Sequence, residues 1–312
     1  MWRLARVPGG EVRSVTARVT VVGEALVDLL WRTGARDVRA APGGSPANVA
    51  VGLRRLGRPA TLLTAWGEDP PGELVRAHLA ETGVTVRRVP AETDRTIVAL
   101  AYLGADGAAR YDFLASWDPR ELPVPEDTAV LHTGSLAVVI EPGASRVLGL
   151  CRELRAGGTT VAADLNVRPA VQPDRDAYRD AARRLAASVD VLKASDEDLG
   201  WLFPGAEPAD AARALLAAGP RLVVVTLGAR GALAVTSGHE VGVAAPAVTV
   251  VDTIGAGDTF QAALLDSIAE RGAPPAAPDE LSAVLRRCAT AAAITCTRIG
   301  ADPPTREELG AL

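Results

Sequence analysis

The chain has 312 residues, of which 48% are hydrophobic and 23% charged, with a formal net charge of −5. That is enough apolar material for a large core, and the acidic balance without a basic patch argues against a nucleic-acid partner. Three cysteines without CxxC spacing and three scattered histidines argue against a disulfide framework and against a structural zinc site.

The first 17 residues have arginines but no apolar core segment, so they read as a loose lead-in and not as a signal peptide. No run of about 18 apolar residues follows, so we expect no membrane span and no membrane partner. A cytoplasmic protein is the expectation.

From residue 18 onward, short β-branched runs alternate with helical apolar faces. The predicted strands are 18–22, 60–65, 84–89, 129–132, 159–163, 189–192 and 221–226. The predicted helices are 47–56, 73–82, 144–155, 175–187, 196–203, 209–218, 258–271 and 280–297. This alternation predicts an α/β fold with right-handed crossovers and a mostly parallel sheet.

Two stretches without helical periodicity, about 27–42 and 95–114, interrupt this rhythm and predict a small β flap. The second contains two alternating segments, 95–103 and 109–114, around a Gly-Ala-Asp-Gly turn, which is a hairpin signal. A second hairpin is expected at 232–244. In a parallel sheet, ligands bind beyond the carboxyl ends of the strands, so motifs at those turns deserve the closest reading.

The string Asp252-Thr253-Ile254-Gly255-Ala256-Gly257-Asp258 leads from a small-residue loop into a helix. Small residues let the backbone approach a ligand, and a helix start behind them forms an anion hole. A carboxylate at its mouth, Asp258, is placed to take a proton from an attacking hydroxyl while N–H groups stabilise a phosphoryl group. The structural alternative is an ordinary glycine turn with Asp258 as a helix cap.

A second string, Pro42-Gly43-Gly44-Ser45-Pro46-Ala47-Asn48, opens an earlier helix. Its glycines allow a hydroxyl-rich ligand to lie against the backbone, and Asn48 offers both a donor and an acceptor. The alternative is a plain helix start with proline near its first position. No GxxxxGK[ST] loop occurs, and Gly23-Glu24 does not continue as GxGxxG, so neither a P-loop NTPase nor a Rossmann dehydrogenase is indicated.

Together, GGSPANVA and DTIGAGD resemble the two motifs of the ribokinase-like (pfkB) carbohydrate kinases, over about residues 19–308. Shorter matches such as DLNVRP and KASDEDL resemble the fructokinase-like branch. The resemblance implies one ribokinase-like domain over residues 18–312, with a central sheet flanked by helices on both faces and a β-sheet lid. It also implies ATP and Mg²⁺, with K⁺ as a further cation, and a homodimer formed through the lid strands.

The resemblance assigns roles residue by residue. The catalytic set is Asp258, with Gly255, Ala256 and Gly257 as the anion hole. The sugar-binding set is Asp28, Gly43, Gly44, Asn48 and Arg168. The ATP-binding set is Asn166, Ser195, Thr226 and Gly228. The metal set is Asp198 for Mg²⁺, and Asp252 with Ile254 for a monovalent cation.

Two departures from the family pattern bear on these roles. The Asn-x-x-Glu element is here Ser195-x-x-Asp198, with a shorter acid, and the segment after Phe113 is shorter than in fructokinases. The expected reaction is ATP-dependent phosphorylation of a small sugar, with fructose as the leading substrate. The alternatives are a 2-keto-3-deoxygluconate kinase, another pfkB sugar or nucleoside kinase, and a sugar-binding regulatory protein with weak catalysis.

Overall fold

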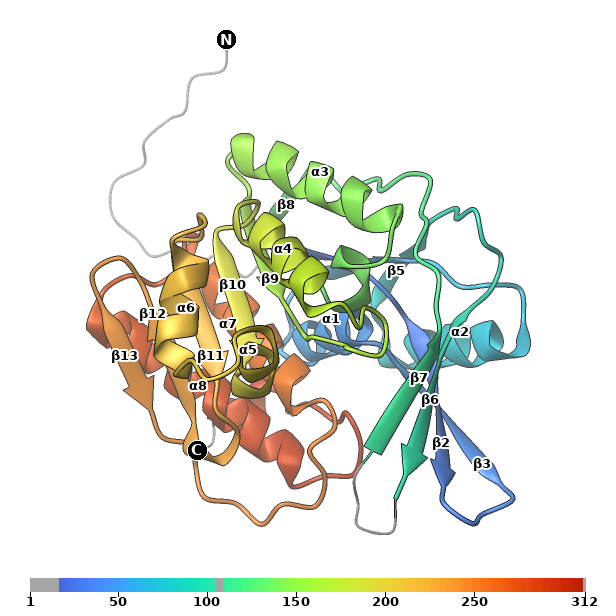
Figure 1. Cartoon of the computed structure of the whole chain (residues 1–312). Helices are drawn as coiled ribbons and strands as arrows, with labels where there is room; N and C mark the ends of the chain where they lie inside the picture. Colours follow the sequence, from blue (N-terminus) through green and yellow to red (C-terminus); the bar gives the residue numbers. More distant parts are fainter. Residues whose placement is uncertain (1–16, 105–108, 311–312) are drawn as a thin grey trace.

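The computed structural model describes residues 17–104 and 109–310 (Figure 1). The predicted lead-in, apart from Ala17, and residues 105–107 of the predicted turn lie outside the described residues. Two sheets make up the strand structure, a nine-stranded one in the order β13-β12-β11-β10-β9-β8-β1-β4-β5 and a four-stranded one in the order β3-β2-β6-β7. The predicted α/β class with a mostly parallel central sheet and a small β-sheet is confirmed.

The nine-stranded sheet is parallel from β5 to β11, and its last two strands run antiparallel as the predicted hairpin. Its strands are β1 (Arg18–Val22), β4 (Ala60–Thr64), β5 (Thr85–Arg88), β8 (Thr128–Gly134), β9 (Thr160–Asp164), β10 (Val191–Ser195), β11 (Leu222–Thr226), β12 (Ala232–Val235) and β13 (Glu240–Val243). The carboxyl ends of the parallel strands therefore lie at one common edge.

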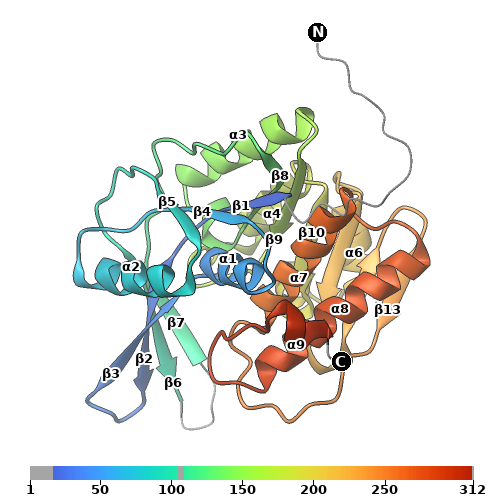
Figure 2. The ribbon, with the colours of Figure 1, turned by 180° about the vertical axis from the view of Figure 1, so that it is seen from behind.

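Helices cover both faces of this sheet. The α-helices are α1 (Ser45–Arg55), α2 (Pro70–Thr82), α3 (Gly143–Ala156), α4 (Arg175–Ala186), α5 (Asp196–Leu202), α6 (Pro208–Leu216), α7 (Ala256–Arg271), α8 (Pro278–Cys296) and α9 (Arg306–Gly310). Figure 1 shows α3 to α6 on one face, and Figure 2, from behind, shows α1, α2, α7 and α8 on the other. None of the helices in the described part of the chain is long and apolar enough to cross a membrane.

Each face has its own apolar core because successive strand side chains point to opposite sides of a sheet. On β11, Leu222 and Val224 belong to the core under α1, α7 and α8, whereas Val223 and Val225 belong to the core under α3 to α6. All four side chains are at most 1% exposed. A strand buried on both faces explains why this segment reads as a continuous β-branched run instead of an alternating one.

The small sheet lies beside the carboxyl edge of the large one (Figure 1). It contains β2 (Leu26–Arg32), β3 (Val38–Gly43), β6 (Ile97–Leu103) and β7 (Ala109–Leu114), so both predicted flap segments contribute. Gly23 follows β1, residues 23–25 lead into β2, and β3 returns the chain to α1. This route carries the glycine-rich motif from the small sheet to the edge of the large one.

Predicted boundaries differ from the observed ones by a few residues at most. Helix α1 begins two residues before the predicted start because Ser45 and Pro46 already fit its first turn. Proline is tolerated there because a backbone N–H in the first turn has no acceptor within the helix. Sequence reading missed α9 and the 3₁₀ turn Ser135–Val138. Both are too short to show a hydrophobic period.

Candidate active site

The two glycine-rich motifs meet at the side chain of Asp258. The hydroxyl of Ser45 donates to Asp258 Oδ1 over 2.7 Å, and the amide Nδ2 of Asn48 donates to Asp258 Oδ2 over 2.8 Å. Asp258 lies in the first turn of α7 and is half-buried. Segments more than 200 residues apart in the sequence are therefore joined at one carboxylate, with both of its oxygens oriented by α1.

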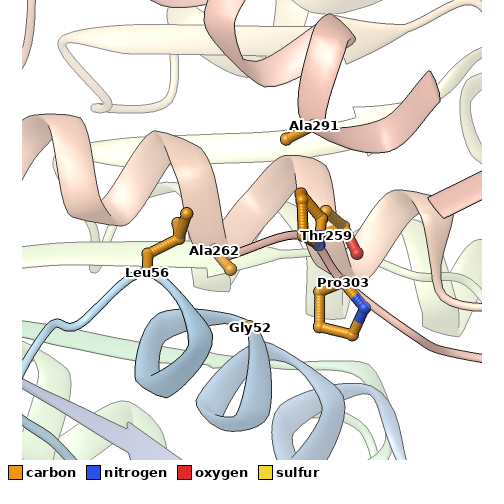
Figure 3. A pocket seen from close by; sticks show the side chains of 7 residues that line it. Gly52, Leu56, Thr259, Ala262, Ala291 and Pro303 are labelled. Carbon is orange, nitrogen blue, oxygen red and sulfur yellow. The ribbon is translucent and has the colours of Figure 1, made fainter. Parts of the chain in front are cut away.

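Close packing of α1 on α7 makes this contact possible. A Cβ on Gly52 of α1 would lie 2.7 Å from the Cβ of Ala262 on α7, which is closer than side chains approach. Figure 3 shows Gly52 facing this part of α7, with Leu56 and Pro303 around it. The absence of a side chain at residue 52 lets the start of α1 reach Asp258.

The start of α7 has the geometry expected of an anion hole. Gly255 caps the helix with φ 76°, and a Cβ there would lie 2.5 Å from the Cβ of Ala301, so glycine is required. Ala256 donates its N–H to the Thr253 carbonyl over 3.2 Å. In the described part of the chain, the N–H groups of Gly257 and Asp258 have no acceptor. Unpaired donors at a helix start attract anions.

Asp28 lies across the β2–β3 pair from the glycine motif. A Cβ on Gly43 would lie only 2.3 Å from Asp28 Oδ2, so the carboxylate occupies the space that glycine leaves. Burial raises the pKa of Asp28 to about 6; the Arg168 guanidinium opposes this shift and the Asp258 charge adds to it. Arg168 and Asp258 therefore both lie close enough to Asp28 to act on its charge.

Gly44 lies against the backbone of Glu24. Gly44 has φ 106°, and a Cβ there would lie 2.7 Å from the Glu24 carbonyl oxygen. The Glu24 side chain is 1% exposed, and its Oε2 has no hydrogen-bond partner. Burial raises the pKa of Glu24 to about 7, against opposing contributions from the Ser135 hydroxyl and from Arg168. Sequence reasoning missed Glu24 as a site residue, although its place directly after the first strand was a usable signal.

The loop after β9 contributes Asn166 and Arg168. Asn166 has φ 42° and donates through Nδ2 to the Ser135 hydroxyl over 3.1 Å, and Ser135 itself has φ 55°. Left-handed backbone at two non-glycine residues in contact is the kind of strain found at functional sites. The backbone N–H of Arg168 donates to the Tyr178 hydroxyl over 3.0 Å, which fixes the loop.

The predicted ATP-binding residues lie at the same edge, further along the sheet. Ser195 and Thr226 end the adjacent strands β10 and β11 and are directly paired in register. Gly228 follows with φ 56°, and the space around it is open. The resemblance assigned these residues to one ATP-binding set, and the fold brings them to one edge because the carboxyl ends of parallel strands lie on the same side of the sheet.

Both carboxylate oxygens of Asp198 accept hydrogen bonds from backbone N–H groups. Its Oδ2 accepts from the Ser195 N–H and its Oδ1 from the Val167 N–H, both over 2.8 Å, and Ser195 caps the helix in return. The side chain is 8% exposed. Direct ligation of Mg²⁺ would compete with these two bonds, so the metal role of Asp198 stays a prediction.

Asp252 connects the loop before α7 to the loop after α8. Its Oδ1 accepts from the Ile254 N–H over 3.1 Å and its Oδ2 from the Gly300 N–H over 2.9 Å. Among the described residues, no group of three or more His, Cys, Asp or Glu side chains is arranged to hold a metal ion. A monovalent cation here would rely on carbonyl oxygens, so this role also stays a prediction.

A helix-start anion site, a carboxylate beside it and a small sheet at the edge of a parallel sheet define a small-molecule kinase of ribokinase-like fold. The chain belongs to the pfkB family of carbohydrate kinases, whose family model matches residues 16–308. The predicted family and the predicted enzyme class are confirmed.

Among curated relatives and solved structures, the chain is similar to fructokinases and to a riboside kinase. The chain is 32% identical over 299 residues to a fructokinase from Klebsiella pneumoniae, covering 92% of this chain and 95% of the relative. A Vibrio cholerae O395 fructokinase double mutant with bound fructose, ADP and potassium ion is 27% identical, with a TM-score of 0.78 over 95% of this chain and 98% of that one. A Salmonella enterica aminoimidazole riboside kinase is 26% identical, with a TM-score of 0.77 over 94% and 99%.

Proposed function

We propose that the chain transfers the γ-phosphoryl group of ATP to a hydroxyl group of fructose. The observation that carries this proposal is the position of Asp258, oriented by Ser45 and Asn48 beside the unpaired N–H groups of α7. The similarity to fructokinases over most of the chain supports fructose as the acceptor.

Each step of the transfer has a group placed for it. Asp258 takes the proton of the attacking hydroxyl. The N–H groups at the start of α7, framed by Gly255, Ala256 and Gly257, stabilise the charge on the transferred phosphoryl group. Asp28, Gly43, Gly44, Asn48 and Arg168 hold the sugar. Asn166, Ser195, Thr226 and Gly228 line the path of the nucleotide.

Bound Mg²⁺ neutralises phosphate charge in such a reaction. We assign Asp198 the task of holding the Ser195 and Val167 backbone, which borders the phosphate path, because both its oxygens are engaged there. Asp252 shapes the loop that contains the Ile254 carbonyl, and we propose this loop as the potassium site, consistent with the potassium ion in the Vibrio cholerae structure. The use of ATP fits a cytoplasmic enzyme.

We treat residues 18–312 as one kinase unit whose small sheet closes over the sugar and excludes water. Trp31, Val38 and Leu114 lie on one face of that sheet and expose 41% or more of their surface. Such a patch fits a homodimer formed through the small sheet. Sedimentation equilibrium tests this: a monomer at all concentrations, or a Leu114→Glu variant that dimerises as the wild type does, contradicts the proposal.

The decisive experiment is an ADP-release assay over fructose, ribose, 2-keto-3-deoxygluconate and aminoimidazole riboside. We expect the largest kcat/KM for fructose. A larger value for another acceptor reassigns the substrate, and tight fructose binding without ADP release supports a regulatory protein instead.

Asp258→Asn is expected to lower kcat by about 10²- to 10⁴-fold with little change in fructose affinity, because the amide cannot accept the proton. Asp279→Asn, at an exposed position in the first turn of α8, is the matched control and should retain wild-type kinetics. Undiminished turnover by Asp258→Asn rules out the assigned base.

A further inference from the structure

The sequence contains one lysine, Lys193, and the structure buries it behind the anion site. Lys193 lies in β10 with 4% of its side chain exposed. Its Nζ donates over 2.6 Å to Oδ2 of Asp164, which ends the neighbouring strand β9 and is 3% exposed. Apart from the histidines, every other basic residue of the chain is an arginine, so the lysine at position 193 is an exception to the arginine-rich composition.

The ammonium group lies against the first turn of α7. The point where a Cβ of Gly257 would lie is 3.7 Å from Lys193 Nζ, and no other atom outside the immediate chain lies within 4 Å of that point. Gly257 has one of the two unpaired N–H groups of the anion hole. No side chain therefore separates the buried cation from the backbone that faces the phosphoryl group.

Folding stability does not account for this placement. A cation at a helix N-terminus faces the positive end of the helix dipole, which is unfavourable. A buried ion pair contributes little net stability, since removing both charges from water costs about as much as their attraction returns. The pair is also incompletely satisfied, because Asp164 Oδ1 is buried without a partner.

Asp164 compensates part of the Lys193 charge, but the ammonium is the nearer group to α7: Lys193 Nζ lies within 4 Å of the Gly257 Cβ position, and no Asp164 atom does. Asp164, which Lys193 contacts directly, and Asp198 have pKa values raised by burial, with Lys193 opposing both shifts. His132 is fully buried, and burial together with Lys193 lowers its pKa to about 3, so it stays neutral. Burial thus raises the pKa of both neighbouring carboxyl groups, and Lys193 is a basic side chain that opposes these shifts.

We propose that Lys193 is a positioning residue for phosphoryl transfer: its ammonium, acting across Gly257, raises the positive potential at the start of α7 and stabilises the charge on the transferred phosphoryl group. The inference rests on the proposed kinase function. It extends that function by adding a fixed charge behind the N–H groups, from a residue that does not touch the sugar.

The first test separates charge from folding. Lys193→Met is expected to lower kcat about 10- to 100-fold, less than the loss of about 10²- to 10³-fold for one oxyanion-hole donor because Lys193 acts across Gly257, while the sugar KM changes less than about threefold. The double variant D164N/K193M removes both buried charges, so it should fold as stably as the wild type and stay as slow as Lys193→Met. Wild-type kcat in either variant overturns the proposal.

The second test does not depend on turnover. Lysine labelled with ¹³C at Cε gives a single resonance in this protein because only Lys193 contributes. We expect that resonance to shift when inorganic tripolyphosphate is added, and not with sodium chloride at equal ionic strength. A resonance that ignores tripolyphosphate overturns the proposal even if the variants are slow. A shift in a wild-type protein that phosphorylates none of the four acceptors keeps the charge effect of Lys193 at the anion site and refutes the proposed sugar transfer alone.

Discussion

Replacing Gly43 with alanine places one methyl group against the carboxylate of Asp28. The new Cβ would lie 2.3 Å from Asp28 Oδ2, so the carboxylate must retreat by about 1 Å to reach an ordinary contact distance. Gly43 does not have a left-handed backbone, so alanine adds no strain of its own. A displaced carboxylate would lose the hydrogen bond to the sugar that we propose for Asp28, and a hydrogen bond to a charged group is worth about 1.5–3 kcal/mol.

That loss corresponds to a rise of about 10- to 150-fold in the sugar KM. The kcat value should stay within about threefold, because Ser45 and Asn48 still orient Asp258. Initial rates by ADP release give both constants, and calorimetric titration gives the sugar affinity without turnover. A change in kcat with an unchanged KM would place Asp28 outside the sugar site.

Gly149→Ala is the matched control for this variant. Gly149 lies within α3, and no atom lies within 4 Å of the added methyl group. We expect wild-type KM and kcat, with a gain in stability of up to about 1 kcal/mol because alanine favours the helix. A KM for Gly43→Ala that equals the KM of Gly149→Ala refutes the reasoning.

Three further variants test the site. Burial raises the pKa of Glu24 to about 7, so the free energy of unfolding of the wild type falls by up to about 3 kcal/mol as pH rises from 5 to 8. Glu24→Gln cannot titrate and should lack this fall. Urea unfolding at both pH values measures it, and a stability difference between the two proteins that is the same at pH 5 and pH 8 contradicts the prediction. Burial raises the pKa of Asp28 to about 6, so kcat/KM for the sugar should fall as pH drops below 6. Asp28→Asn should remove this inflection from the pH profile. If the inflection persists in the variant, another group causes it. Asp252→Asn weakens the contacts that shape the proposed potassium loop, so stimulation by KCl over NaCl should diminish; unchanged stimulation places the cation elsewhere.

The regular elements were predictable because their signals are local. The run Leu222–Thr226 and the helical period of 258–271 depend on neighbouring residues alone. The contact of Ser45 with Asp258 has no local signal, because it requires the packing that Gly52 allows between α1 and α7. The site motifs were recognisable, but the geometry that joins them was not.

Asp198 shows a second limit of sequence reading. The motif Ser195-x-x-Asp198 suggested a metal ligand, by resemblance to a longer acid in relatives. In the fold, the short side chain reaches the backbone N–H groups of Ser195 and Val167. The shorter acid therefore caps the backbone in this chain, and the metal role that the resemblance assigns to Asp198 stays a prediction.

The acidic residues of the site raise a final physical question, because a polyphosphate must approach several carboxyl groups. Burial answers part of it: the pKa values of Glu24, Asp28 and Asp198 are all raised, so each carboxyl group holds its proton to higher pH than it would in water. A proton retained on Glu24, whose pKa is about 7, removes one negative charge beside the site, whereas Asp28, whose pKa is about 6, is ionised above pH 6 as its proposed contact with the sugar requires. The desolvation that makes Glu24 costly for folding therefore also lowers the electrostatic barrier to the nucleotide, and the unpaired N–H groups of α7 then face fewer competing anions.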